Sequence, residues 1–217
     1  VDRARAAIAN YEKEYGERST QKRIAGCVPP LTDCYFANKV PTSINDLISE
    51  YKAILSTLLD CNVDILLAET ISTTREAVAI LLSLSEIQKM SKQKNIPPLW
   101  ISFTIHDDRP NKLRSDELLE TACKTTIQEA NAINIQLEAI GVNCSTPSAI
   151  SNAVPALAKI AEGTNIKVSA YGNCFKTTTS EWISSLDEDV VVKGESKSAG
   201  APFRTHTAEE YDEEGYL

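Results

Sequence analysis

Two chemically reactive side chains stand at the ends of short apolar segments. The carboxylate of Glu69 ends the segment 64–69, and the thiol of Cys144 ends the segment 138–144. Such segments are typical of β-strands, and a strand end that faces a core usually carries an apolar or small residue. If the strands are parallel, their carboxyl ends meet on one edge, where active sites form. The other groups that strand ends deliver there are Cys27, Thr104, Asn143, Tyr171, Gly172 and Asn173.

Each of the two reactive groups also has an ordinary structural explanation. Glu69 could cap the helix that follows it. Cys144 could be a small buried apolar residue, which is the commonest role of a free cysteine. The residues alone leave these explanations open beside the functional ones.

Other catalytic chemistries find little support in the sequence. The two histidines, His106 and His206, are not near a nucleophile motif, so a Ser-His-Asp or Cys-His arrangement is not indicated. There is no Gly-x-x-x-x-Gly-Lys loop and no Gly-x-Gly-x-x-Gly after the first expected strand, so nucleotide cofactors are not indicated. The run 106–108 could bind a metal, but its polar surroundings predict a solvated turn.

Composition excludes several classes of protein. The 217 residues include 22 Lys and Arg against 30 Asp and Glu, a formal charge of −8, and 42% are hydrophobic. This apolar content is enough for a core and excludes general disorder, while the negative charge disfavours nucleic acid as a partner. No apolar run approaches the about 18 residues of a membrane helix, and residues 1–5 do not resemble a signal peptide. The six cysteines form no Cys-x-x-Cys pair, so we expect reduced thiols in a cytoplasmic protein that does not bind membranes.

Short β-branched runs alternate with stretches of helical periodicity through most of the chain. Successive strands begin about 29 to 41 residues apart, the size of one βα unit. The pattern predicts a parallel α/β protein, either an open doubly wound sheet or part of an eight-stranded barrel. Capping boxes at Thr73 and Thr207 each predict the start of a helix. The expected strands are 23–28, 64–69, 99–105, 138–144 and 167–171; the expected helices are 3–15, 45–61, 73–92, 115–133, 147–162 and 207–215; and 172–205 is expected to be a long polar loop.

Two segments carry a resemblance to a known family. The Asp-x-x-x-x-Glu-Thr run at 64–70 and the Gly-Val-Asn-Cys run at 141–144 occur in order, with Trp-Ile-Ser-Phe-Thr at 100–104 between them. Supporting segments are Glu76-Ala77, the run 25–30, Leu113-Arg114 and the run 171–173. The whole chain resembles the homocysteine S-methyltransferase family, zinc-dependent (βα)8 barrels that methylate homocysteine to methionine. The resemblance favours the barrel over the open sheet.

The resemblance implies a zinc site and two small-molecule substrates. In the family, three thiolates hold zinc and the homocysteine thiol takes the fourth position, where its pKa falls and it attacks the methyl group of a cationic donor. Cys144 would be the first zinc ligand, Glu69 would hold the amino group of homocysteine, and Asn143 would lie beside the metal. Asn143, Thr104, Tyr171 and Asn173 are also expected to bind substrate. The donor is not identified: S-methylmethionine, S-adenosylmethionine and betaine are all used, and a folate-cobalamin route is less favoured.

The sequence also departs from the family. The other two zinc ligands are adjacent cysteines in a Gly-Gly-Cys-Cys segment on the eighth strand, whereas this sequence stops at 215–217. We therefore expect residues 1–217 to form one barrel domain truncated at both ends, containing strands three to seven. Cys27 and Cys174 match no family ligand, and Pro29 and Asp116 stand where the family has glycine, in turns that can need a positive φ.

An incomplete barrel has physical consequences. Two unpaired edges and uncovered apolar faces predict that the isolated chain is poorly soluble or dimerises. A single cysteine ligand predicts much weaker zinc binding than a complete site. The alternatives are a non-catalytic α/β remnant or interaction module that has lost the zinc site, and an unrelated open-sheet enzyme, in which Cys144→Ala would change neither metal content nor activity.

Overall fold

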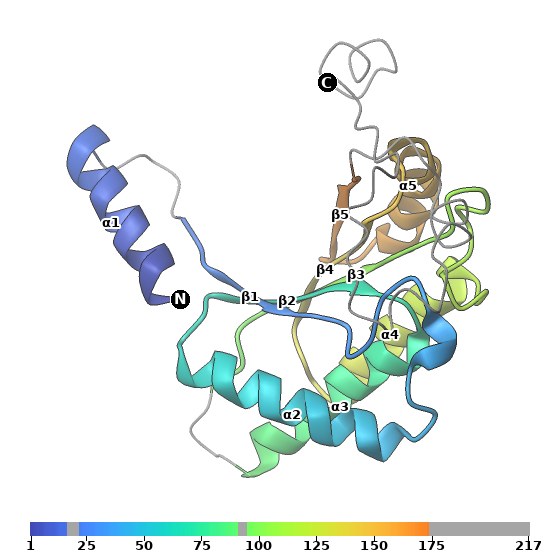
Figure 1. Ribbon diagram of the computed structural model, residues 1–217, viewed down its shortest axis with the longest axis horizontal. Helices are drawn as coiled ribbons and strands as arrows, with labels where there is room; N and C mark the ends of the chain where they lie inside the picture. The colour runs from blue at the N-terminus through green and yellow to red at the C-terminus, as the bar shows by residue number, and fades with distance from the viewer. Residues whose placement is uncertain (17–21, 91–94, 174–217) are drawn as a thin grey trace, which may run out of the picture.

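The computed structural model describes residues 1–16, 22–90 and 95–173. The expected alternation of strands and helices is confirmed in this part of the chain (Figure 1). The elements are α1 (Asp2–Tyr15), β1 (Ala25–Val28), the short 3-10 helix η1 (Ala37–Lys39), α2 (Ile44–Asp60), β2 (Ile65–Ile71), α3 (Thr74–Met90), β3 (Leu99–Phe103), α4 (Leu119–Ala132), β4 (Leu137–Asn143), α5 (Pro147–Ala161) and β5 (Lys167–Tyr171).

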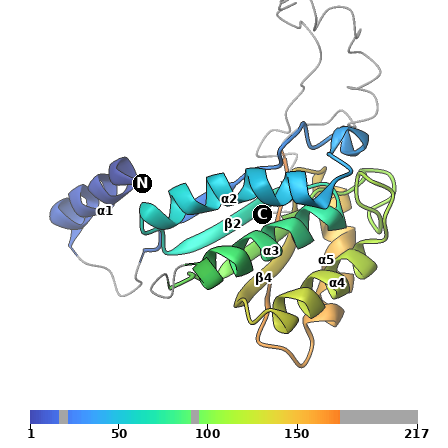
Figure 2. The same cartoon turned by 90° about the horizontal axis from the view of Figure 1, so that it is seen from below.

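The five strands form one parallel sheet in the order β1-β2-β3-β4-β5. In a doubly wound sheet the strand order reverses at a switch point, and helices cover both faces. Here the order never reverses, and Figure 2 shows α2, α3 and α4 side by side in front of the strands, while α5 packs against α4, β4 and β5. Sequential parallel strands with helices on one side are the pattern of a (βα)8 barrel. The structure therefore confirms the incomplete barrel and rules out the open doubly wound sheet.

The core lies between the sheet and these helices. Tyr51 and Leu55 on α2, Ile80 and Leu84 on α3, and Leu66 on β2 are fully buried. They come from the apolar stripe of each helix and from the strand face that meets it. Apolar packing between the helices and the sheet therefore holds the strands whose carboxyl ends carry the candidate site residues.

The start of α3 follows the predicted capping box. The Thr73 hydroxyl accepts a hydrogen bond from the Glu76 amide at 3.1 Å, and the helix begins at Thr74. The Glu76 carboxylate is fully buried and accepts hydrogen bonds from the hydroxyls of Ser72 at 3.0 Å and Tyr51 at 3.2 Å. A buried carboxylate needs such partners, so this cap also ties α2 to α3.

One helix boundary was wrong. The helix expected from residue 115 begins at Leu119, because the preceding residues form a tight turn. The Leu113 amide donates to the Glu117 carbonyl at 2.9 Å, Lys112 and Leu118 form an antiparallel bridge, and Asp116 has φ 66°. The positive φ expected at this family glycine is therefore present, and aspartate tolerates it better than most residues.

The helix expected at 207–215 lies outside the described residues, as does the 172–205 loop except for Gly172 and Asn173. No helix in the described ranges has the length and apolar character needed to cross a bilayer.

Candidate active site

The carboxyl ends of the strands bring the predicted site residues to one edge of the sheet. Glu69 lies on β2, Thr104 follows β3, Asn143 ends β4 and is followed by Cys144, and Tyr171 ends β5. Within the described residues they form two groups, one around Glu69 and one around Cys144, and Asn143 connects them.

The first group is the Glu69 carboxylate with two hydrogen-bond donors, a tyrosine hydroxyl and a cysteine thiol. The Tyr171 hydroxyl donates a hydrogen bond to Glu69 Oε2 at 2.8 Å, and the Cys27 thiol also hydrogen-bonds to Glu69. Partial burial of the sulfur and the Glu69 carboxylate together raise the pKa of Cys27 to about 12. Burial and the same carboxylate raise the pKa of Tyr171. Both neighbours therefore stay protonated and donate to Glu69 near neutral pH.

This contact also shows how strongly the sheet curves. β5 and β2 are separated by two strands, which in a flat sheet would put them about 14 Å apart. Tyr171 and Glu69 nevertheless meet in a hydrogen bond. The strands must therefore curl toward the face that carries these side chains, as they do in a barrel.

The second group surrounds the sulfur of Cys144. The Tyr35 hydroxyl lies 3.4 Å from Cys144 Sγ, and the Cys34 thiol hydrogen-bonds to the same sulfur. The Cys34 hydrogen bond, followed by the Tyr35 hydrogen bond and the charge of Arg114, lowers the pKa of Cys144 to about 6 against the opposing effect of burial. The pKa values of Cys34 and Tyr35 are raised in turn, so both remain donors. These contacts favour the thiolate form of Cys144.

A buried ion pair supports this group. Arg114 Nη2 lies 3.3 Å from Asp107 Oδ2, and both side chains are only 4% exposed. The Arg114 guanidinium also lies over the Tyr35 ring, with 5.2 Å to its centroid. Asp107 Oδ1 accepts the Thr146 amide at 2.8 Å, at the N-terminus of α5. The prediction of a solvated turn at 106–108 was wrong for Asp107, because Arg114 neutralises it in a buried position.

Asn143 holds the two groups in a fixed relation. Its Oδ1 accepts the Thr70 amide at 2.9 Å, and its Nδ2 donates to Thr70 Oγ1 at 2.8 Å. Thr70 follows Glu69 and Cys144 follows Asn143, so the amide joins the residues that carry the two reactive groups. Thr70 and Cys144 have φ values of 65° and 53°. Left-handed conformations of non-glycine residues cost about 1–3 kcal/mol each and are concentrated at functional sites.

Two further predicted residues contact the Cys144 segment. Thr104 Oγ1 donates to the Cys144 carbonyl at 3.3 Å and is fully buried. The backbone N–H of Asn173 donates to the Ser145 backbone carbonyl at 3.0 Å, which ties the end of β5 to the loop after β4.

The ordinary explanations of the reactive groups do not fit this geometry. Glu69 does not cap α3, because Thr73 does so and Glu69 accepts from Tyr171 instead. Cys144 is half-buried among polar donors rather than packed as an apolar residue.

Sequence reasoning gave no functional role to Cys34 and Tyr35, which come from the loop after β1. The adjacent thiol and phenol were the available signal, but nothing in the pattern placed this loop against the end of β4.

Among the described residues, no group of three or more His, Cys, Asp or Glu side chains is arranged to hold a metal ion.

The similarity of the chain to known proteins agrees with this arrangement. Three crystal structures of the homocysteine methyltransferase MmuM from Escherichia coli, in apo, metallated and oxidised forms, match it with TM-scores of 0.56, 0.58 and 0.58. Each is 20% identical and covers 83% of this chain, and the chain spans 67%, 66% and 66% of those structures. At this identity the likeness shows a shared fold. No curated protein sequence matches the chain. The profile of the homocysteine S-methyltransferase family matches residues 1–207, and the chain therefore belongs to that family.

Proposed function

We propose that the protein transfers a methyl group from a small cationic donor to the thiol of homocysteine, giving methionine, at a zinc ion held in part by Cys144. The observation that carries the proposal is the position of the Cys144 sulfur just after the carboxyl end of β4, where the Tyr35 hydroxyl lies 3.4 Å away and lowering of the Cys144 pKa favours the thiolate. Family membership supports the reaction, and the metallated form of the E. coli enzyme supports a metal. A cytoplasmic location and a single barrel domain over residues 1–217 stay predictions.

The chemistry of the donor set fits zinc in part. A thiolate is the form in which cysteine binds metal, and the lowered pKa of Cys144 reduces the cost of removing its proton on binding. Its half-buried position leaves room for further ligands, which the described residues do not complete. When bound, zinc would lower the pKa of the homocysteine thiol so that a nucleophilic thiolate exists near neutral pH.

The chain's own residues would bind and orient homocysteine. Glu69 carries the negative charge that an α-ammonium group requires, and Tyr171 and Cys27 fix its carboxylate by hydrogen bonds. Asn143 keeps the Glu69 segment and the Cys144 segment in register, which sets where the amino end and the thiol of one substrate would lie. Thr104 and Asn173 hold the loop that carries Cys144. Such positioning converts binding energy into rate.

A methyl-transfer assay tests the proposal. The chain is incubated with zinc, homocysteine and, in separate reactions, S-methylmethionine, S-adenosylmethionine or betaine, and methionine is measured by mass spectrometry. We expect methionine from at least one donor, its loss in Cys144→Ala, and no change in Cys61→Ala, an exposed cysteine at the end of α2. Activity that survives Cys144→Ala would contradict the assignment, and absence of methionine with every donor would favour the non-catalytic remnant.

A further inference from the structure

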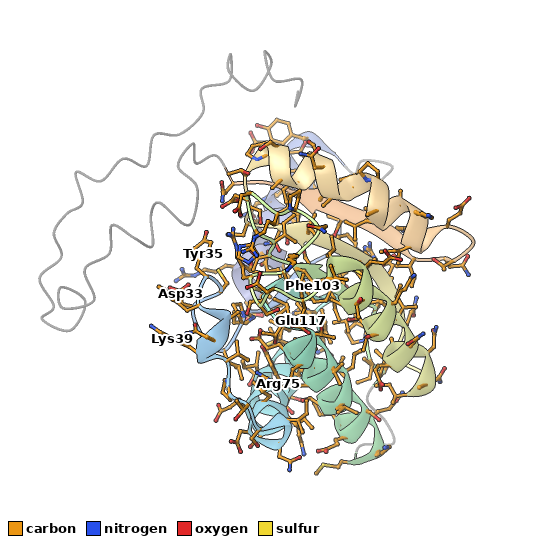
Figure 3. All side chains as sticks on the ribbon, turned by 90° about the vertical axis from the view of Figure 1, so that its right-hand side faces the viewer. Asp33, Tyr35, Lys39, Arg75, Phe103 and Glu117 are labelled. Atoms are coloured by element: carbon orange, nitrogen blue, oxygen red, sulfur yellow. The ribbon has the colours of Figure 1, made fainter. Side chains whose placement is uncertain are left out.

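A cavity adjoins the candidate site. Its volume is about 470 Å3, and its walls come from the segments that follow β1 and β3 and from the start of α3. Tyr35, which contacts Cys144, and Arg114, which lies over the Tyr35 ring, form the wall nearest the sulfur, and Arg75 and Glu117 also line the cavity. Figure 3 shows Tyr35, Arg75 and Glu117 projecting from three different segments of the chain. The cavity is large enough for a molecule of amino-acid size.

Arg75 is the cation in this cavity that lacks an acidic partner within the described residues. Its one recorded hydrogen bond joins Nη2 to the Val40 carbonyl at 3.4 Å, which is long. Its Nε is buried without an acceptor. Buried donors on a charged group are costly to leave unpaired, and their occurrence in a native fold calls for an explanation. An incoming carboxylate, which accepts two hydrogen bonds from one guanidinium, supplies what this side chain lacks.

The other charged groups lining the cavity are already engaged. Asp107 pairs with Arg114, and Arg109 pairs with Asp116. Glu117 Oε2 accepts the Thr74 amide at 3.1 Å and the Ser115 hydroxyl at 2.6 Å. The two acidic side chains lining the cavity, Asp116 and Glu117, disfavour a ligand with several negative charges and favour one that also carries a positive charge.

We propose that this cavity binds the carboxylate end of a small zwitterion, with Arg75 as the residue that selects for the carboxylate. The inference rests on the proposed function, because the zwitterion is then the methyl donor, an amino-acid sulfonium or a quaternary ammonium carboxylate. Tyr35 forms part of the cavity and also touches Cys144 Sγ, so a ligand anchored at Arg75 has its other end directed along this wall toward the sulfur. Arg75 is thus a specificity-determining residue for the donor.

Paired ligands and matched variants test this assignment. Dissociation constants are measured by isothermal titration calorimetry for betaine against choline, in which a hydroxymethyl group replaces the carboxylate, and for S-methylmethionine against trimethylsulfonium, which lacks the whole amino-acid end. The proteins are the wild-type chain, Arg75→Gln and the control Arg3→Gln, which changes an exposed arginine on α1 in the same way. Loss of a hydrogen bond to a charged group predicts about 10- to 100-fold weaker binding of the preferred carboxylated donor to Arg75→Gln. Choline and trimethylsulfonium should bind all three proteins equally weakly.

Several results would overturn the carboxylate site. These are equal binding of the carboxylated donor to wild type and Arg75→Gln, an equal loss in Arg3→Gln, or no binding of any carboxylated donor to wild type. If Arg75→Gln fails to fold, the proposal is still tested by comparing the two ligands of each pair on the wild-type chain. Equal affinity for the two members of each pair contradicts the proposal. Homocysteine binding is measured in parallel, so that failure of the proposed function, in which homocysteine also does not bind, is distinguished from failure of the donor site alone.

Discussion

Replacing Cys34 with alanine should raise the pKa of Cys144. The hydrogen bond from Cys34 is the largest of the effects that hold this pKa at about 6. A hydrogen bond to a charged group contributes about 1.5–3 kcal/mol, and one pKa unit corresponds to about 1.4 kcal/mol, so its loss should raise the pKa by about one to two units. At pH 7 the thiolate fraction would fall from about nine tenths to between about one half and one tenth. Alkylation at pH 7 should therefore slow by about two- to tenfold.

The assay is iodoacetamide alkylation of the metal-free chain between pH 5 and 9, with the Cys144 peptide quantified by mass spectrometry. Below the pKa the protonated thiol reacts slowly, and above it the rate reaches a plateau, so the midpoint of the profile reports the pKa. In the wild-type chain Cys144 should react near neutral pH, while the more exposed Cys27, with a pKa of about 12, should not. Cys61→Ala is the control. An unchanged midpoint in Cys34→Ala would refute the reasoning.

Three further perturbations probe the fold around the site. Asp107→Ala leaves the buried charge of Arg114 without its partner and should lower the free energy of unfolding by about 3–5 kcal/mol in urea titrations; a loss below about 1 kcal/mol would mean that the pair is solvated. Gly141→Ala places a methyl group against the Ser169 backbone carbonyl and should destabilise the chain by about 3 kcal/mol or more, and a thermal midpoint equal to wild type would contradict this. The edge strands β1 and β5 predict dimers or aggregates in size-exclusion chromatography, and a stable monomer that unfolds cooperatively would count against exposed edges.

Local patterns predicted the elements because local rules determine them. The largely apolar run 64–69 predicted a buried parallel strand, which the structure has as β2, and the Thr73 capping box predicted the start of α3 to within one residue. Once five parallel strands were expected, the position of Glu69, Thr104 and Cys144 at one edge followed from geometry alone. The choice between a barrel and an open sheet did not follow, because strand order depends on long-range pairing.

The partners of the reactive groups could not be predicted for the same reason. Cys34 and Tyr35 reach Cys144 across more than one hundred positions of sequence, through a loop with no periodicity. The pairing of Arg114 with Asp107 depends on a turn that buries both charges. Loop conformations of this kind are set by tertiary contacts rather than by propensity, so the lowered pKa of Cys144 had no signal in the sequence.

The most direct test of the account is whether Cys144 binds a metal ion that the homocysteine sulfur then also coordinates. Cadmium is titrated into the chain, and the ultraviolet charge-transfer absorption of cadmium–thiolate bonds is recorded before and after homocysteine is added, each time on the protein fraction after rapid gel filtration has removed unbound cadmium and homocysteine. The account predicts that absorption rises with cadmium, rises again with homocysteine, and that both increases are lost in Cys144→Ser but kept in Cys61→Ser. Identical spectra from the wild-type chain and Cys144→Ser would contradict it.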